Sequence, residues 1–349
     1  MAFSENRYLS WYMERAFRHD DAVNLHASGV PAIEPLEIPG DRVSPWKQMT
    51  DFEAALAGWL GIPEQEVLFT PGATGGTLLA LACLVRPGST VLVDLPMYEP
   101  MVAQAERLGQ VQRLQRRFED RWRLPLEQAR HALKGNVSVV MLCEPGNPTG
   151  TFSDRQDVID LVRMAERKGA YVLINEVYRG FSNRLSYHGI GQNVLVVSSL
   201  SKLLGAYSYR LGWLSGSSEE IVRLRMGHFN LGVGTSPAAV AGGRIVASRA
   251  DGIRAEALAQ SRHGAQVVDQ WVRKQEGLTW HIPEGPGFGC IRLPDGMDDM
   301  AFAERLHDEH GVLLVPGSLF ELPGTVRVSW LQAGGRLEEG LEVLGRMLR

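Results

Sequence analysis

Short apolar runs alternate with helical patterns along most of this chain, and this alternation limits the folds that it can adopt. From Thr50 onward, helix-like segments separate five apolar runs, at residues 67–70, 91–94, 138–143, 171–174 and 193–197. The run at 138–143 is continuously apolar, which is typical of a strand buried on both faces of a parallel sheet. The pattern predicts an α/β fold with a mostly parallel sheet flanked by helices.

The rest of the chain predicts a second, smaller unit. A helical stretch runs from about residue 236 to 274 with a break near residue 251, and shorter strands and helices follow it to the C-terminus. The Pro-rich residues 31–45 show no periodicity and indicate a crossing segment. We therefore predict a large domain over residues 46–250 and a small α/β domain from residues 1–45 and 251–349. Residues 115–123 carry charges of mixed sign and predict a solvated loop.

Composition excludes several classes of function. The 349 residues are 44% hydrophobic and 22% charged, which is ordinary for a globular enzyme. A net charge of −4 gives no basic excess for neutralising phosphates, so we expect no nucleic-acid partner. The longest apolar run is too short to span a bilayer, and no signal-peptide pattern opens the chain, so we expect no membrane partner. Three widely spaced cysteines predict neither disulfides nor a metal site and favour a reducing, cytoplasmic compartment.

The strongest candidate for chemistry is Lys202, which follows the fifth apolar run in the sequence Ser199-Leu200-Ser201-Lys202. A lysine amine that is removed from water loses its proton more readily and can attack an aldehyde to form a Schiff base. The two serines and Arg210 are suited to holding a phosphate beside it. The alternative for an isolated Ser-Lys pair is an exposed lysine in a serine-rich turn.

Further candidates follow the other apolar runs. Ligands of open α/β sheets bind at the carboxyl ends of the strands, where Asn147 and Tyr98 are expected. An aromatic side chain there could stack on a heteroaromatic ring, although a buried tyrosine is an equal alternative. The small residues 71–76 open a helix whose free N–H groups could bind an anion, although a tight turn would also explain them.

These segments, in their order and spacing, resemble the class I/II aminotransferase family. The similarity runs from about residue 20 to the C-terminus and is carried by Glu144-Pro145-Gly146-Asn147-Pro148-Thr149-Gly150, Asn175-Glu176-Val177-Tyr178, and Lys202 with Arg210. Members are pyridoxal-phosphate (PLP) enzymes with the aspartate aminotransferase fold, PLP fold type I. The resemblance implies PLP as cofactor, a small-molecule amino-acid substrate and a homodimer.

The resemblance also implies a role for each matched residue. Lys202 would bind PLP covalently and, once displaced, act as the base that moves the α-proton. The other cofactor-binding residues would be Ala73, Thr74, Tyr98, Asn147, Asn175, Tyr178, Ser199, Ser201 and Arg210. Arg327 would hold the substrate α-carboxylate as a bidentate pair, near Asn147 and the backbone of Gly29. Arg327 could instead be structural, but burying an unpaired arginine is costly.

The chain departs from the family at two positions. The family has an aspartate where this chain has Asn175, and an uncharged amide cannot keep the cofactor's pyridine nitrogen protonated. Glu176 is a poor substitute, because adjacent strand residues point to opposite faces. A family tyrosine that reaches the phosphate from the neighbouring subunit has no clear match in residues 42–49, where Trp46 is the aromatic residue present. The first departure casts doubt on efficient transamination.

Three hypotheses for the function remain. The segment Trp11 to Phe17, with Ser28-Gly29-Val30, resembles capreomycidine-synthase-like enzymes, which eliminate and cyclise a hydroxylated arginine. In that case His26 would be a proton-transfer group, and Glu14 or Glu34 would pair with the guanidinium. The second hypothesis is a conventional aminotransferase that uses 2-oxoglutarate. The third is a non-catalytic PLP-binding homologue, which the presence of Lys202 and Arg327 argues against.

Overall fold

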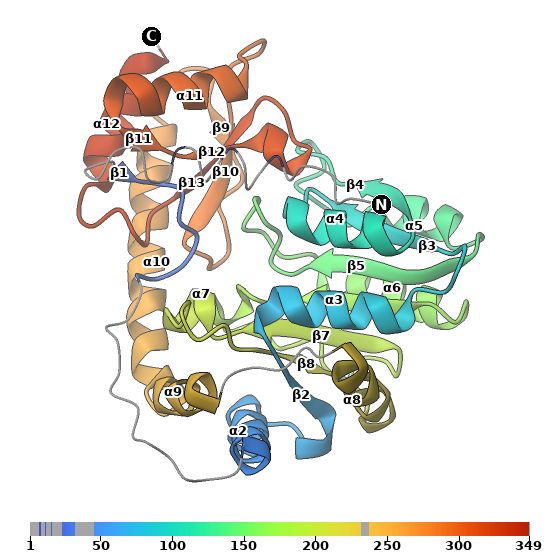
Figure 1. The fold of residues 1–349 in the computed structure, drawn as a ribbon. Helices are drawn as coiled ribbons and strands as arrows, with labels where there is room; N and C mark the ends of the chain where they lie inside the picture. Colours follow the sequence, from blue (N-terminus) through green and yellow to red (C-terminus); the bar gives the residue numbers. More distant parts are fainter. Residues whose placement is uncertain are drawn as a thin grey trace.

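The structure is a computed structural model that describes residues 23–31, 45–231 and 237–348, together with Arg7, Trp11 and Arg15. Its largest element is a seven-stranded sheet with the order β2-β8-β7-β6-β5-β3-β4 (Figure 1). In that order, the strands are Val67–Thr70, Gly212–Ser215, Val194–Ser199, Tyr171–Asn175, Val137–Cys143, Thr90–Leu95 and Gln110–Gln115. β8 runs antiparallel to both its neighbours, and the strands from β7 to β4 are parallel. The predicted mostly parallel sheet is confirmed.

Helices cover both faces of this sheet. One hydrophobic core lies between the sheet and the helices α3 (Gly72–Leu84), α4 (Glu99–Leu108) and α8 (Ser218–Leu231), and contains Val139 and Met141 of β5. The other lies against α5 (Leu126–Ala132) and α6 (Arg155–Glu166) and contains Val140 and Leu142. Successive residues of β5 therefore enter opposite cores, as the continuously apolar run predicts.

A second sheet carries the C-terminal part of the chain. Its antiparallel strands have the order β12-β13-β10-β9, which are Val315–Pro316, Thr325–Ser329, Phe288–Arg292 and Thr279–Trp280. Beside it lie α11 (Asp299–His310) and α12 (Leu337–Met347), and β11 (Val312–Leu313) pairs in parallel with β1 (Val23–Asn24). This pairing holds the described part of the N-terminal segment against the C-terminal part. The exact domain boundaries at residues 45–46 and 250–251 stay a prediction.

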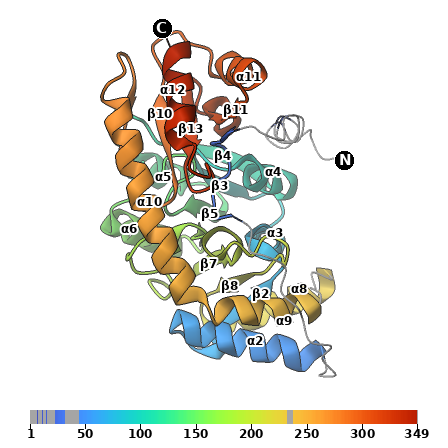
Figure 2. The same cartoon turned by 90° about the vertical axis from the view of Figure 1, so that its left-hand side faces the viewer.

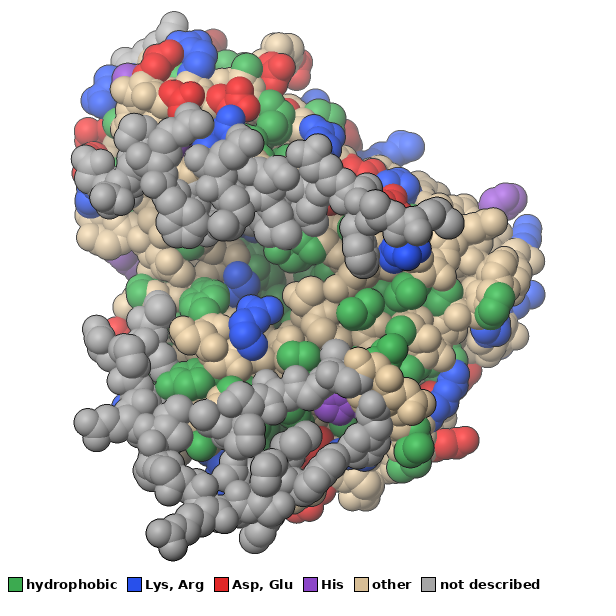
Figure 3. All heavy atoms as spheres, in the orientation of Figure 1, with side chains coloured by type: hydrophobic (Ala, Val, Ile, Leu, Met, Phe, Trp, Pro, Cys, Tyr) green, Lys and Arg blue, Asp and Glu red, His purple; other side chains and the backbone are tan. Residues whose placement is uncertain are grey.

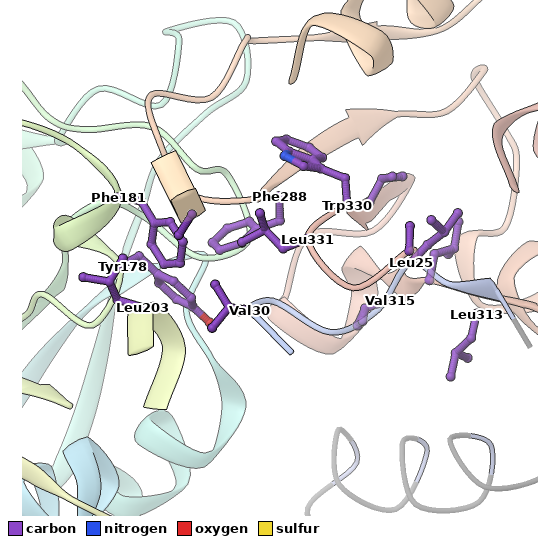
Figure 4. Close-up of a cluster of buried hydrophobic side chains, with 14 of the residues drawn as sticks. Leu25, Val30, Tyr178, Phe181, Leu203, Phe288, Leu313, Val315, Trp330 and Leu331 are labelled. Carbon is purple, nitrogen blue, oxygen red and sulfur yellow. The ribbon is translucent and has the colours of Figure 1, made fainter. Parts of the chain in front are cut away.

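Long helices and a shared core connect the two sheets. α2 (Pro45–Leu60) packs on α9 (Pro237–Ala247), and α10 (Ala250–Val272) runs past both sheets along one side of the molecule (Figure 2). In Figure 4, Tyr178 and Leu203 approach Val30 and Phe288. These side chains belong to one buried hydrophobic cluster that joins the two sheets.

Several elements differ from the sequence prediction. The sequence predicts a helix over residues 77–84, whereas α3 begins at Gly72, so the small residues form its first turns. The helical stretch after residue 236 is two helices, with the break at residues 248–249. The short elements α7 (Ser201–Leu204) and the 3-10 turns at Glu64–Glu66, Arg179–Phe181 and Gly317–Phe320 were not anticipated, nor were β4, β8, α4, α5 and α8.

The prediction of a solvated loop at 115–123 is wrong for two of its residues. Arg116 and Trp122 are 4% and 1% exposed. The guanidinium of Arg116 donates two hydrogen bonds of 2.9 Å and one of 2.6 Å to Asp94, and one of 2.9 Å to Glu144. Both carboxylates are buried at the ends of neighbouring strands, so they need a buried cation. Burial acts to lower the pKa of Arg116, but the charges of Asp94 and Glu144 raise it overall, so the guanidinium keeps its charge.

We expect Arg116→Met to lower the free energy of unfolding by about 3–5 kcal/mol, because it leaves two buried carboxylates without their cation. Urea unfolding followed by circular dichroism measures the change. The matched control is Arg113→Met, which removes salt bridges from a side chain that is 42% exposed and is expected to cost less than about 1 kcal/mol. Equal losses in the two variants would show that the buried network has no special role.

Candidate active site

The predicted cofactor-binding residues and Arg327 meet in a cavity of about 180 Å³ at the carboxyl ends of the parallel strands. It is lined by Ser28, Gly72, Ala73, Thr74, Tyr98, Met101, Cys143, Asn147, Asn175, Val177, Tyr178, Ser199, Ser201, Lys202, Tyr207, Arg210 and Arg327. Arg327 comes from the second sheet, and Ser28 comes from the N-terminal segment. The fold thus brings together every predicted cofactor-binding residue.

One end of the cavity has the features of an anion site. α3 begins at Gly72, so the free N–H groups of its first turn lie at the cavity wall. The guanidinium of Arg210 lies against the same turn, where a Cβ on Gly72 would be 3.2 Å from Nη2. Arg210 also has a positive φ of 51°, a conformation that is uncommon for a residue other than glycine and is concentrated at functional sites. The hydroxyl-bearing Ser199 and Ser201 complete this end.

Asn175 and Tyr178 lie at and just after the end of β6. The side-chain oxygen of Asn175 accepts a 2.9 Å hydrogen bond from the N–H of Val177, and its Nδ2 lies 3.2 Å from Sδ of Met101. The hydroxyls of Tyr178 and Ser28 are 2.8 Å apart, so the N-terminal segment helps to place the tyrosine. Tyr98 stands before α4 and faces the same cavity, as its predicted stacking role requires.

Arg327 lies in the middle of β13 and is 1% exposed. Its Nη1 donates to Oδ1 of Asn147 at 2.9 Å, and its Nη2 donates to the carbonyl oxygen of His26 at 2.8 Å. Its Nε has no hydrogen-bond partner, and no carboxylate pairs with it among the described residues. A buried cation without a carboxylate partner among the described residues is suited to binding an anionic group that enters the cavity.

Lys202 shares this cavity with two other cations. Burial, and then the positive charges of Arg327 and Arg210, lower the pKa of Lys202 to about 8. The ring of Tyr207 lies 5.3 Å from its amine nitrogen. A lysine with this pKa has a substantial neutral fraction near neutral pH, which nucleophilic attack requires.

Gly29 and His26 lie beside the cavity but do not line it. A Cβ on Gly29 would be 2.0 Å from the Tyr207 hydroxyl oxygen and 3.0 Å from the Lys202 carbonyl oxygen, so the close approach is to protein. His26 is 8% exposed, and burial followed by the charges of Arg327 and Lys202 lowers its pKa to about 3. Its imidazole is neutral at pH 7, and its carbonyl is the group that contacts Arg327.

The described lining of the cavity contains three basic side chains and no acidic one. In Figure 3, Lys or Arg side chains lie at the hollow in the middle of the molecular face. Such a lining favours a ligand, or a pair of ligands, with more than one negative charge. In the part of the chain that the structure describes, no group of three or more His, Cys, Asp and Glu side chains is placed to hold a metal ion.

Sequence reasoning missed Met101 and Tyr207 and gave Ser28 no role of its own. Met101 and Tyr207 lie in helix or turn segments that carry no recognisable motif. Only the folded structure shows that they line the cavity. Glu14, Glu34 and the side chain of Trp46 lie outside the described residues. A search of the described helices finds none with the length and apolarity needed to cross a bilayer.

Comparison with known proteins agrees with this geometry. The family model "Aminotransferase class I and II" matches residues 40–346. The chain is 28% identical over 292 residues to an aspartate aminotransferase of Thermotoga maritima, which covers 80% of this chain and 75% of the relative. It is 25% identical to aromatic-amino-acid aminotransferase 2 of Thermococcus litoralis, over 82% and 77% of the two chains.

Solved structures show the same fold. A PLP-dependent aminotransferase from Streptococcus suis superposes with a TM-score of 0.88 at 24% identity and covers 100% of this chain and 98% of its own. An aspartate aminotransferase structure from Thermotoga maritima gives a TM-score of 0.84 at 21% identity, over 99% and 98%. The fold, the cavity and the family match together establish that this chain belongs to the class I/II aminotransferase family of PLP-dependent enzymes.

Proposed function

We propose that the protein transfers the amino group of an α-amino acid to a 2-oxo acid, with Lys202 as the residue that binds PLP. The observation that carries this proposal is the buried guanidinium of Arg327, which faces the cavity of Lys202 without a described carboxylate partner. An α-carboxylate is a planar acceptor that matches this guanidinium. Aspartate and aromatic amino acids are the first substrates to assay, because relatives carry those names.

The residues of the cavity fit PLP. The open first turn of α3, with Arg210, Ser199 and Ser201, would hold its phosphate. Tyr98 and Val177 would contact the ring, and Asn147 and Tyr178 would donate to its phenolic oxygen. Bound PLP supplies an electron sink that stabilises negative charge at the substrate α-carbon.

Lys202 would transfer the proton of the substrate α-carbon, and Tyr178 would present its hydroxyl beside it. With its pKa lowered to about 8, the Lys202 amine can both accept and return a proton near neutral pH. The bond between Tyr178 and Ser28 fixes the direction of the tyrosine hydroxyl. His26, whose pKa is lowered to about 3, would act through the carbonyl that orients Arg327, and its imidazole would stay neutral.

One observation favours a second candidate, the elimination and cyclisation of a hydroxylated arginine. Asn175 stands where the family has an aspartate, and an amide strengthens the electron sink less than a carboxylate does. We further propose a cytoplasmic homodimer with a large domain at 46–250 and a small domain from 1–45 and 251–349.

Product mass spectrometry tests the reaction. We expect the PLP-loaded protein to convert aspartate, or an aromatic amino acid, into its oxo acid only when 2-oxoglutarate is present. The panel includes arginine and 3-hydroxyarginine, and Lys202→Ala is the inactive control. Loss of water from 3-hydroxyarginine without an acceptor would instead establish the second candidate.

We expect Arg327→Lys to raise the KM for the amino acid roughly 10- to 100-fold, because the loss of a charge-assisted bidentate contact costs about 1.5–3 kcal/mol. PLP binding, followed by absorbance, should be retained. The control is Arg292→Lys, because Arg292 lies on the neighbouring strand and pairs with Glu119 at the surface. An unchanged KM in Arg327→Lys would refute the carboxylate-binding role.

The lowered pKa of Lys202 predicts the pH dependence of cofactor capture. Only the neutral amine reacts, so capture of PLP by the apo-protein should accelerate with rising pH and level off above about 8, not above the ordinary lysine value of 10.5. Stopped-flow absorbance measures the rate. Lys202→Ala should abolish this phase, and Lys168→Ala, which changes an exposed lysine, should keep it. A midpoint near 10.5 would contradict the lowered pKa.

A further inference from the structure

The orientation of the Asn175 amide is fixed by its neighbours. The backbone N–H of Val177 lies 2.9 Å from one side-chain atom of Asn175. A backbone N–H can only donate, so that atom is the oxygen and the other is the nitrogen. The nitrogen then lies beside the sulfur of Met101, and both residues line the cavity.

The amide nitrogen has one hydrogen to spare. Nδ2 carries two hydrogens, and one of them points to the Met101 sulfur at 3.2 Å, which accepts weakly and has no hydrogen to donate. The structure gives Nδ2 no second partner among the described residues. The surroundings therefore suit an amide at position 175, and they offer a carboxylate there a single donor, the N–H of Val177.

No nearby carboxylate compensates for the amide. The described cavity lining has no acidic residue, while Lys202, Arg210 and Arg327 are basic. The carboxylate of Glu176 is bound by Arg179, Ser186 and the N–H of Tyr187. The carboxylate of Glu144 is bound by Arg116 and Ser153.

We propose that Asn175 donates its spare N–H to the ring nitrogen of PLP and holds that nitrogen unprotonated, with the N–H of Val177 setting the direction of the amide. This inference rests on the proposed PLP site. An N–H donor can bind only the lone pair of an unprotonated pyridine nitrogen. The basic side chains of the cavity act in the same direction, because they disfavour a further positive charge. The site thereby weakens the electron sink and slows removal of the α-proton.

Nitrogen NMR of the unaltered protein tests this without relying on turnover. We would load the protein with PLP labelled with ¹⁵N in its ring and record the ring-nitrogen resonance across the pH range in which the protein stays folded. The expected resonance is that of a hydrogen-bonded, unprotonated pyridine at every pH. A resonance typical of protonated pyridine at neutral pH would overturn the inference.

Two variants sharpen the result. Asn175→Asp should move the resonance to the protonated range, shift the visible absorption band of the bound cofactor and speed deuterium exchange at the substrate α-carbon. Met101→Leu, the matched control, removes the sulfur and keeps the amide, so its ring nitrogen should stay unprotonated. An unchanged resonance in Asn175→Asp would also overturn the inference.

The two proposals fail in different ways. If the protein does not retain PLP after gel filtration, the proposed function and this inference both fail. If it retains PLP with a protonated ring nitrogen, this inference alone fails. If Asn175→Asp does not fold, the resonance of the unaltered protein still decides the question.

Discussion

The rest of the site depends on the contacts of the buried guanidinium of Arg327. It lies on the second sheet and donates to Asn147, beyond the end of β5, and to the backbone of His26 in the N-terminal segment. The ring centroids of Phe288 and Phe320 lie 5.5 and 5.3 Å from its Cζ, within the range of cation–π contacts. Three parts of the chain thus converge on one charge, and the anion that would neutralise this charge completes the site.

The other features of the cavity follow from this basic character. The first turn of α3 with Arg210 offers a second anion position, and the combined positive charge, after burial, lowers the pKa of Lys202. A ligand with both a phosphate and an attached amino acid would satisfy both anion positions. The presence of an amide at position 175 is consistent with this basic lining, because Asn175 is an uncharged hydrogen-bond donor.

Much of this could be predicted from the sequence, because strand periodicity and the position of polar residues after strands are local signals. The runs at 138–143 and 171–174 placed Asn147 and Asn175 at one sheet edge, and the structure brings both into the cavity. Arg116 shows where prediction from local sequence signals fails. Its surroundings look like a solvated loop in sequence, but Asp94 and Glu144 meet it only after β3, β4 and β5 have paired. The positions of Met101 and Tyr207 could not be predicted for the same reason, because only tertiary packing brings them to the cavity.

The proposed function depends on the binding of PLP through Lys202. Its most direct test is to incubate the full-length protein with PLP, reduce the complex with borohydride, digest it and locate the added mass by tandem mass spectrometry. We expect a single modified peptide containing Lys202, at one PLP per chain. Modification spread over exposed lysines such as Lys168 and Lys274, with Lys202 unmodified, would refute the role of Lys202.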